Sequence, residues 1–349
     1  MRRDKDIAER IVRMRLLSQQ LRAPQFARPA EVVRWMGMVQ AQEYRMMRWA
    51  VAMRTRRPSL AAFTKAYNEG RIIRTHLFRT TWQLVACEDV RWMLPLCADR
   101  NRQALTGFLA NYSRRLTERQ FLHFNDVLAD VLSSSATMGR NELVEHLASR
   151  GIEDDAHTLS IYMRRAEIDG VVCSGHIDPR QNTYALLDAR VAPAPQLALD
   201  EAVALLAHRY FLSHAPATLG DFIWWTNLPA SDCRRAVQDI ASELAVVCLD
   251  GIDYYIHQNC RTRGGKADVC LLPSYDEYLL GYKSRHLVLR DEYRHRAFTN
   301  NGIFRPVILA AGHVVGNWHP KETVPTFFTE QDEVDTRCAY QAYRDFLER

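Results

Sequence analysis

Two glutamines, Gln40 and Gln42, stand one residue apart directly after an apolar helical segment that contains Val32, Val33 and Met36. Each amide offers two N–H donors and a carbonyl acceptor, and these groups need partners wherever they are partly buried. Side chains two positions apart in an extended or turn conformation point in the same direction. The pair can therefore hold one ligand or one water molecule. The alternative is that both amides bond the backbone at a turn between two helices.

Arginine is concentrated in the first third of the chain. Residues 1–120 contain 24 lysines and arginines against 10 aspartates and glutamates, while the whole chain of 349 residues carries a formal charge of only +5. Arginine suits phosphate contact because its planar guanidinium presents several donors in a fixed fork. The asymmetry therefore predicts a polyanionic partner, which we take to be double-stranded DNA. A solvated, arginine-rich surface is the other interpretation, since charge argues for association and not for a fold.

Several classes of site are disfavoured by the sequence. The eight cysteines are scattered without a Cys-x-x-Cys pair, which indicates reduced thiols and neither disulfides nor a zinc site. His313 and His319 stand apart from other metal-binding residue types, so no metal and no cofactor is expected. Asp276 and Glu277 are neighbours that cannot face one another on a helix, and we interpret them as fixing the turn after Pro273. Without a long apolar segment or secretory signal, we expect a cytoplasmic monomer that does not bind membranes.

The apolar pattern predicts three groups of helices, each followed by a β-hairpin. The first group has helices near 5–18, 30–38, 44–53 and 58–69, strands at 71–76 and 80–85, and further helix over 88–134. The second has helices at 140–149 and 155–169 and strands at 171–173 and 184–187. The third has helices at 201–213, 217–225 and 231–244 and strands at 246–249 and 252–256, joined by Asp250-Gly251.

Helices followed by a small hairpin form the outline of a winged helix, and the residues after Gly264-Gly265 change to strand-forming segments. We therefore predict a mainly α fold with some β structure, made of three tandem winged-helix units and a C-terminal β-rich, barrel-like domain with a terminal helix near 330–347. The expected domains are residues 1–135, which carry the two glutamines, and then 136–192, 193–262 and 263–349.

Six segments together carry a resemblance to a known family. They are Val39–Gln42, Arg71–Trp82, Ser213–Phe222, Leu271–Leu279, Asn300–Ile303 and Val315–Trp318. This combination resembles the AlkZ/YcaQ-type winged-helix DNA glycosylases over most of the chain. The resemblance implies three winged helices on a C-terminal β-barrel, a C-shaped DNA-binding cleft and monofunctional excision of alkylated purines. The family's catalytic motif is Gln-aliphatic-Gln, or Gln-aliphatic-Asp in another branch, and Gln40-Ala41-Gln42 fits the first form. Many relatives have a histidine after the tryptophan, where this chain has Gln83.

Given this resemblance, Gln42 is expected to position a hydrolytic water and Gln40 to orient it or to contact the sugar. Hydrolysis of an N-glycosidic bond usually needs a carboxylate, but an N7-alkylguanine is already cationic and leaves readily. The expected substrates are N7-alkylguanine and bulky or crosslinked adducts in damaged DNA. The residues predicted to contact DNA are Arg45, Arg48, Arg71, Arg74, His76 and Arg79, with His76 and Arg79 in the loop of the first hairpin.

A winged-helix protein that binds DNA without excising a base, either a regulator or a damaged-DNA binder, is the alternative function. Gln40 and Gln42 discriminate between a glycosylase and a regulator, because the function of a regulator does not require converging amides away from its recognition helices. A regulator is also expected to dimerise on a palindromic site, and no segment of this sequence resembles a dimerisation helix.

Overall fold

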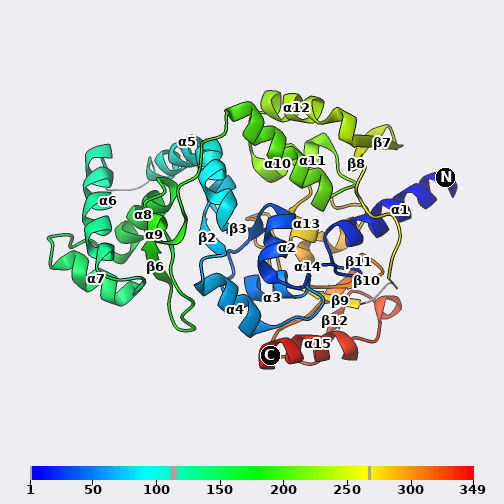
Figure 1. Cartoon of the computed structure of the whole chain (residues 1–349). Helices are drawn as coiled ribbons and strands as arrows, with labels where there is room; N and C mark the ends of the chain where they lie inside the picture. The colour runs from blue at the N-terminus through cyan, green and yellow to red at the C-terminus, as the bar shows by residue number, and fades with distance from the viewer. Residues whose placement is uncertain (1, 111–115, 266–268) are drawn as a thin grey trace. The chain divides into compact units, whose positions relative to one another are not determined.

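A computed structural model describes residues 2–110, 116–265 and 269–349 of the chain (Figure 1). The chain forms two compact units, one made of Met1–Phe63 with Leu199–Arg349 and the other of Thr64–Ala198. This grouping differs from the four consecutive segments expected from the sequence, because the N-terminal segment packs with the C-terminal part. Within the described residues, no helix combines the length and the apolar character that a membrane span needs.

Helices form the N-terminal and central parts of the first unit. They are α1 (Arg2–Ser18), α2 (Pro29–Met36), α3 (Met46–Ala52), the start of α4 (Leu60–Asn68), α10 (Leu199–Ser213), α11 (Leu219–Thr226) and α12 (Ala230–Asp239). A two-residue strand, β1 (Val39–Gln40), lies between α2 and α3. The helix predicted over 231–244 is too long, because α12 ends at Asp239 and Leu244 already begins a strand. The β-branched pair Val246-Val247 favours that strand.

The hairpin predicted from Asp250-Gly251 is confirmed. It consists of β7 (Leu244–Leu249) and β8 (Ile252–His257), which pair antiparallel up to Leu249 and Ile252. Both turn residues have positive φ, 50° for Asp250 and 74° for Gly251, as a two-residue type I′ turn requires. A 3-10 turn, η3 (Ala241–Glu243), connects α12 to this hairpin.

The C-terminal part of the first unit is built on a four-stranded antiparallel sheet. Its strands are β9 (Val269–Leu272), β10 (Val307–Ala310), β11 (His313–Asn317) and β12 (Thr326–Phe327), in the order β12-β11-β10-β9. Across the described ranges this sheet is open, and no closed sheet is found that would confirm the barrel-like prediction.

A helix and several short turns complete this C-terminal part. Tyr340 and Phe346 of α15 (Arg337–Glu348) share a buried apolar cluster with Leu271 and Ile308 of the sheet. The remaining elements are α13 (Glu277–Leu280), η4 (Asp291–Tyr293), α14 (Arg294–Ala297) and η5 (Glu330–Asp332). The segment from α13 to α14 runs between β9 and β10 in the sequence and so connects two neighbouring strands.

The second unit contains two hairpins that the sequence predicted. One pairs β2 (Ile72–His76) with β3 (Trp82–Ala86), and the other pairs β5 (Val172–Ser174) with β6 (Thr183–Leu186), to which the short β4 (Met138–Gly139) adds. Its helices are α5 (Val90–Leu109), α6 (Glu118–Ser133), α7 (Arg140–Ala148), α8 (Ala156–Ile168) and α9 (Leu187–Arg190), with 3-10 turns η1 (Phe78–Thr80) and η2 (Cys87–Asp89). Phe124 stacks on Tyr162 in its core, with ring centroids 4.6 Å apart.

Candidate active site around Gln40 and Gln42

Gln40 and Gln42 lie on the short connection between α2 and α3, in two different environments. Gln40 ends β1 and is only 5% exposed, whereas Gln42 is exposed to solvent. Within the residues that the structure describes, the Gln42 amide has no hydrogen-bond partner. The turn therefore does not use this amide to bond the backbone, and its donors and acceptor can bind a ligand or a water molecule.

A buried carboxylate from the far end of the sequence holds the backbone of Gln40. The N–H of Gln40 donates to Oε1 of Glu277 at 2.8 Å, a contact that spans 237 residues. The other oxygen, Oε2, accepts the indole N–H of Trp225 at 3.1 Å. Glu277 is 2% exposed, so both oxygens are engaged inside the protein. The sequence interpretation of Glu277 as a residue that fixes a turn missed this contact, although Glu277 lies in one of the segments that carry the family resemblance.

His214 borders the same carboxylate. Its Nε2 lies 3.7 Å from Oε2 of Glu277, its Nδ1 lies 2.8 Å from Oγ of Ser213, and its ring stacks on Tyr210 at 4.7 Å between centroids. Burial lowers the pKa of His214 and outweighs the opposing influence of Glu277. The imidazole is therefore neutral at pH 7, so no imidazolium lies beside Glu277.

Asp276, the neighbour of Glu277, forms a buried ion pair. Its two oxygens accept from Nη2 and Nη1 of Arg54 at 2.8 and 2.9 Å, and both side chains are almost completely buried. Oδ1 also accepts the N–H of Tyr278 at 2.9 Å, which caps the N-terminus of α13. Nη1 of Arg54 donates to the carbonyl of Ala50 in α3 at 2.7 Å. This pair thus fixes α13, which begins with Glu277, against the end of α3.

Charged residues follow the glutamines directly. The Glu43 carboxylate accepts the first N–H of α3 at 2.7 Å, so this acid is engaged at a helix N-terminus. Arg45 is exposed. The guanidinium of Arg48 lies 5.1 Å from the ring centre of Tyr44, and its Nε and Nη2 have no hydrogen-bond partner in the described part of the chain. Arg45 therefore lies on the same connection as Gln42, and Arg48 lies in α3, the helix that follows it.

The four predicted DNA contacts of the second unit divide into surface and buried residues. Arg71 is exposed and pairs with Glu69 at 3.0 Å, and Arg79 lies half-buried in η1 with φ of 61°. Arg74 and His76 are each 2% exposed. The prediction that His76 lies in the hairpin loop is wrong, because it is the last residue of β2.

Buried partners in the second unit explain the position of these two residues. Nδ1 of His76 bonds the carboxylate of Glu167 on α8, which also accepts the indole N–H of Trp82 at 3.0 Å. The guanidinium of Arg74 lies 4.4 Å from the ring centre of Trp82, and its Nη1 donates to Oγ of Ser174 at 3.2 Å. An internal network thus holds Arg74 and His76, and neither side chain is presented at the surface for contact with a phosphate.

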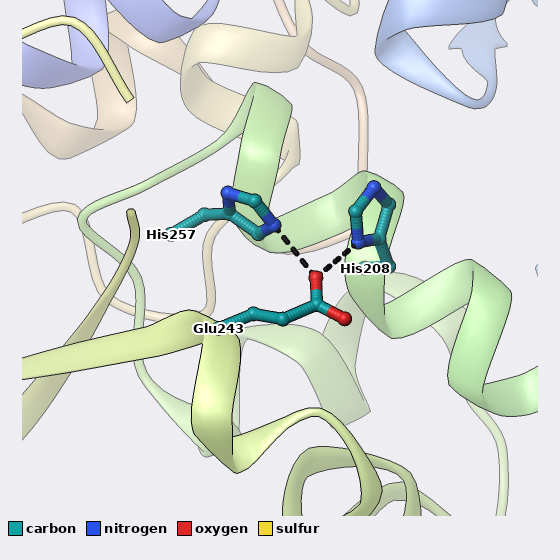
Figure 2. A group of neighbouring side chains, drawn as sticks. All are labelled: His208, Glu243 and His257. Carbon is teal, nitrogen blue, oxygen red and sulfur yellow. Dashed lines mark hydrogen bonds and ion pairs between the residues drawn. The ribbon is translucent and has the colours of Figure 1, made fainter. Parts of the chain in front are cut away.

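Three residues that the sequence reasoning did not single out meet in the first unit (Figure 2). His208 of α10 and His257 of β8 both point a ring nitrogen at Oε2 of Glu243, at 2.6 and 2.9 Å. These side-chain types can bind a transition metal. Nδ1 of His257, however, accepts the N–H of Asn259 at 3.1 Å, so its Nε2 carries the hydrogen and donates to Glu243. A ligating histidine has its other nitrogen protonated and donating, so we describe the group as a His–Glu–His bridge between α10 and the β7–β8 hairpin.

The His–Glu–His bridge predicts a pH-dependent contribution to stability. Partial burial acts to raise the pKa of Glu243, but hydrogen bonds from His257 and His208 outweigh it and leave this pKa below its ordinary value. The stabilisation is therefore present above the unfolded pKa of about 4.3 and is lost as the pH falls through the folded value. We expect Glu243→Gln to lower the melting temperature at pH 6. The difference in melting temperature between this variant and the wild type, measured by calorimetry, is expected to become smaller toward pH 3. A difference that stays constant with pH would contradict the bridge.

The fold and the sequence match known DNA glycosylases. A family model described as DNA glycosylase AlkZ-like matches residues 33–337, which is more than half of the chain. The chain therefore belongs to the AlkZ-like DNA glycosylase family, a class of hydrolases that act on N-glycosyl bonds. It is 24% identical over 321 residues to the interstrand DNA cross-link repair glycosylase of Streptomyces sahachiroi, covering 86% of this chain and 85% of that protein. The solved structure of Streptomyces sahachiroi DNA glycosylase AlkZ shares the mixed α and β fold, with a TM-score of 0.76 and 21% identity over 97% of this chain and 96% of that one.

Proposed function

We propose that this protein is a monofunctional DNA glycosylase that hydrolyses the N-glycosidic bond of N7-alkylated purines in damaged double-stranded DNA. The observation that carries the proposal is the position of the exposed Gln42 amide two residues after Gln40, whose backbone N–H is held by Glu277. The relative from Streptomyces sahachiroi is described as an interstrand cross-link repair glycosylase. We therefore include bulky and crosslinked N7 adducts among the substrates.

The chemistry suits a neutral amide pair. An N7-alkylguanine carries a positive charge, so the bond between C1′ and N9 can break with its electron pair going to the base, which leaves as a neutral molecule. A water molecule then adds to C1′ and releases its proton to solvent. The carbonyl of Gln42 accepts a hydrogen bond from this water and directs its lone pair at C1′, while Gln40 orients the water or contacts the sugar. No bond to the protein forms, and the product is an abasic site.

DNA contact is proposed for the exposed or half-buried arginines. Arg45 follows Gln42 on the same connection, and Arg48 lies in α3. In the second unit, Arg71 directly precedes β2 and Arg79 lies in η1, between β2 and β3. We propose that the helix-and-hairpin groups are winged-helix units that act as a scaffold in a monomer. Arg74 is proposed to have a structural role inside the second unit, since it is buried.

The direct test uses a duplex that contains a single 7-methylguanine. Incubation with the purified protein is expected to release the free base and to leave a site that breaks only after alkali treatment. Strand cleavage before alkali would contradict the monofunctional assignment. Duplex binding without base release, across several N7 adducts, would favour the alternative of a non-catalytic DNA-binding protein.

Glu277 is proposed as a positioning residue for Gln40. In Glu277→Gln the new amide can accept from only one of its two neighbours, because its NH₂ group must face either the Gln40 N–H or the Trp225 indole N–H. We expect about tenfold slower excision with unchanged DNA affinity, equivalent to about 1.4 kcal/mol in the barrier. Single-turnover kinetics at saturating enzyme and equilibrium DNA titration measure the two quantities.

Trp225→Phe supplies the matched control for this positioning role. Removal of the indole N–H lets the carbonyl of the introduced amide accept from Gln40 again, so the double variant Glu277→Gln/Trp225→Phe is expected to excise faster than Glu277→Gln alone. A double variant that is slower than both single variants would indicate that Glu277 acts on stability and not on Gln40.

A further inference from the structure

Two adjoining cavities open in the first unit along the segment 283–300, which connects α13 to β10. They measure about 440 and 280 Å³ and share the lining residues Asp291, Arg294 and Phe298. Lys283 and Arg285 line the smaller cavity, and His295 lines the larger. We call this surface the basic groove. It lies outside the arginine-rich first third of the sequence, so the charge count gave no reason to expect it.

Two of the cations in the basic groove are available to a ligand. Lys283 and Arg294 are exposed, and neither makes an ion pair within the residues that the structure describes. Arg285 is fixed in place, since its Nε donates to the carbonyl of Leu279 at 2.6 Å and its guanidinium lies 4.8 Å from the ring centre of Phe298. Together they provide one fixed and two adaptable positive charges.

Asp291 is the carboxylate that lines both cavities, and it lowers the net charge of the basic groove by one. Three cations against one anion leave an excess of positive charge, to which two histidines, His286 and His295, add when they are protonated. A concave surface with excess positive charge and adaptable cationic side chains is suited to a polyanion backbone.

We propose that the basic groove binds the phosphodiester backbone of the same DNA on which Gln42 acts, an inference that rests on the proposed function. Lys283 follows Glu277 by six residues, so their Cα atoms are at most about 22 Å apart. Glu277 directly holds the backbone of Gln40 at 2.8 Å. Phosphates on one strand recur about every 3.4 Å along the helix axis, so a strand that passes Gln40 places phosphates within reach of the groove.

The test measures duplex affinity against salt for Lys283→Ala, Arg294→Ala and the double variant. Each lost phosphate contact is expected to reduce the magnitude of the slope of log affinity against log salt concentration by about 0.9. The affinity at 0.1 M salt is then expected to be about eightfold weaker. Asp291→Asn is expected to change affinity in the opposite direction, with severalfold tighter binding. Arg344→Ala, which removes an exposed arginine of α15, is the matched control and is expected to bind like wild type.

The outcomes separate the basic groove from the proposed function. Suppose that the wild type excises 7-methylguanine and that Lys283→Ala and Arg294→Ala bind DNA with the wild-type affinity and salt slope. This result would overturn the proposal that the basic groove binds DNA and would leave the glycosylase assignment intact. If the wild type does not excise the base but its DNA binding still depends on Lys283 and Arg294, the glycosylase assignment is overturned and the proposal of DNA binding by the basic groove is retained.

Discussion

Gln42→Ala is expected to slow the excision of 7-methylguanine about 100-fold and to leave duplex affinity within about twofold of wild type. The exposed amide is proposed to hold the attacking water, and loss of a group that activates or places a nucleophile costs at least this much in rate. The change corresponds to about 2.7 kcal/mol in the barrier. Base release under single-turnover conditions, with enzyme above its dissociation constant, measures the chemical step without interference from binding.

Two further variants make this prediction specific. Gln196→Ala removes an exposed glutamine from the segment between α9 and α10 and is expected to excise at the wild-type rate. Gln42→Asp is expected to retain activity, since a carboxylate can accept the water proton and the family resemblance includes a Gln-aliphatic-Asp form. Equal rates for Gln42→Ala and wild type would remove the glutamine from catalysis.

Local sequence signals predicted the elements that depend on local physics. The β-branched residues Ile72 and Ile73 indicated a strand, and Asp250-Gly251 indicated a two-residue turn, because backbone conformation there is decided by the residues themselves. The same signals failed where tertiary contacts decide. His76 was placed in a loop as a polar residue at the end of a strand, yet Glu167 on a distant helix compensates for its burial.

The candidate site shows the same division. Gln40 and Gln42 were predicted from residue type and spacing, and both lie on the expected connection between two helices. The contact that fixes Gln40 could not be predicted from local pattern, because Glu277 is 237 residues away and looks like half of an ordinary acidic pair. The open sheet was not predicted for a similar reason. Strand propensity in residues 263–349 indicates where strands form, but it does not indicate how many of them pair in one sheet.

Asp276→Ala is expected to give the largest loss of stability among single substitutions near the site, about 3–5 kcal/mol in the free energy of unfolding. It leaves the guanidinium of Arg54, which is 0% exposed, without its carboxylate in the interior, and an uncompensated buried charge costs this much. It also removes the cap of α13, which contributes about 1 kcal/mol. Urea denaturation measures the change.

A double-mutant cycle separates the ion pair from the cap. Arg54→Met removes the cation, and Asp276→Asn keeps an oxygen for the N–H of Tyr278 while removing the charge. We expect the double variant to be more stable than the sum of the two single changes predicts, because each single change leaves one buried charge unpaired and the double change leaves none. Additive losses would show that Arg54 and Asp276 act independently. Since Asp276 caps the helix that begins with Glu277, the variants that loosen it are also expected to slow excision through Gln40.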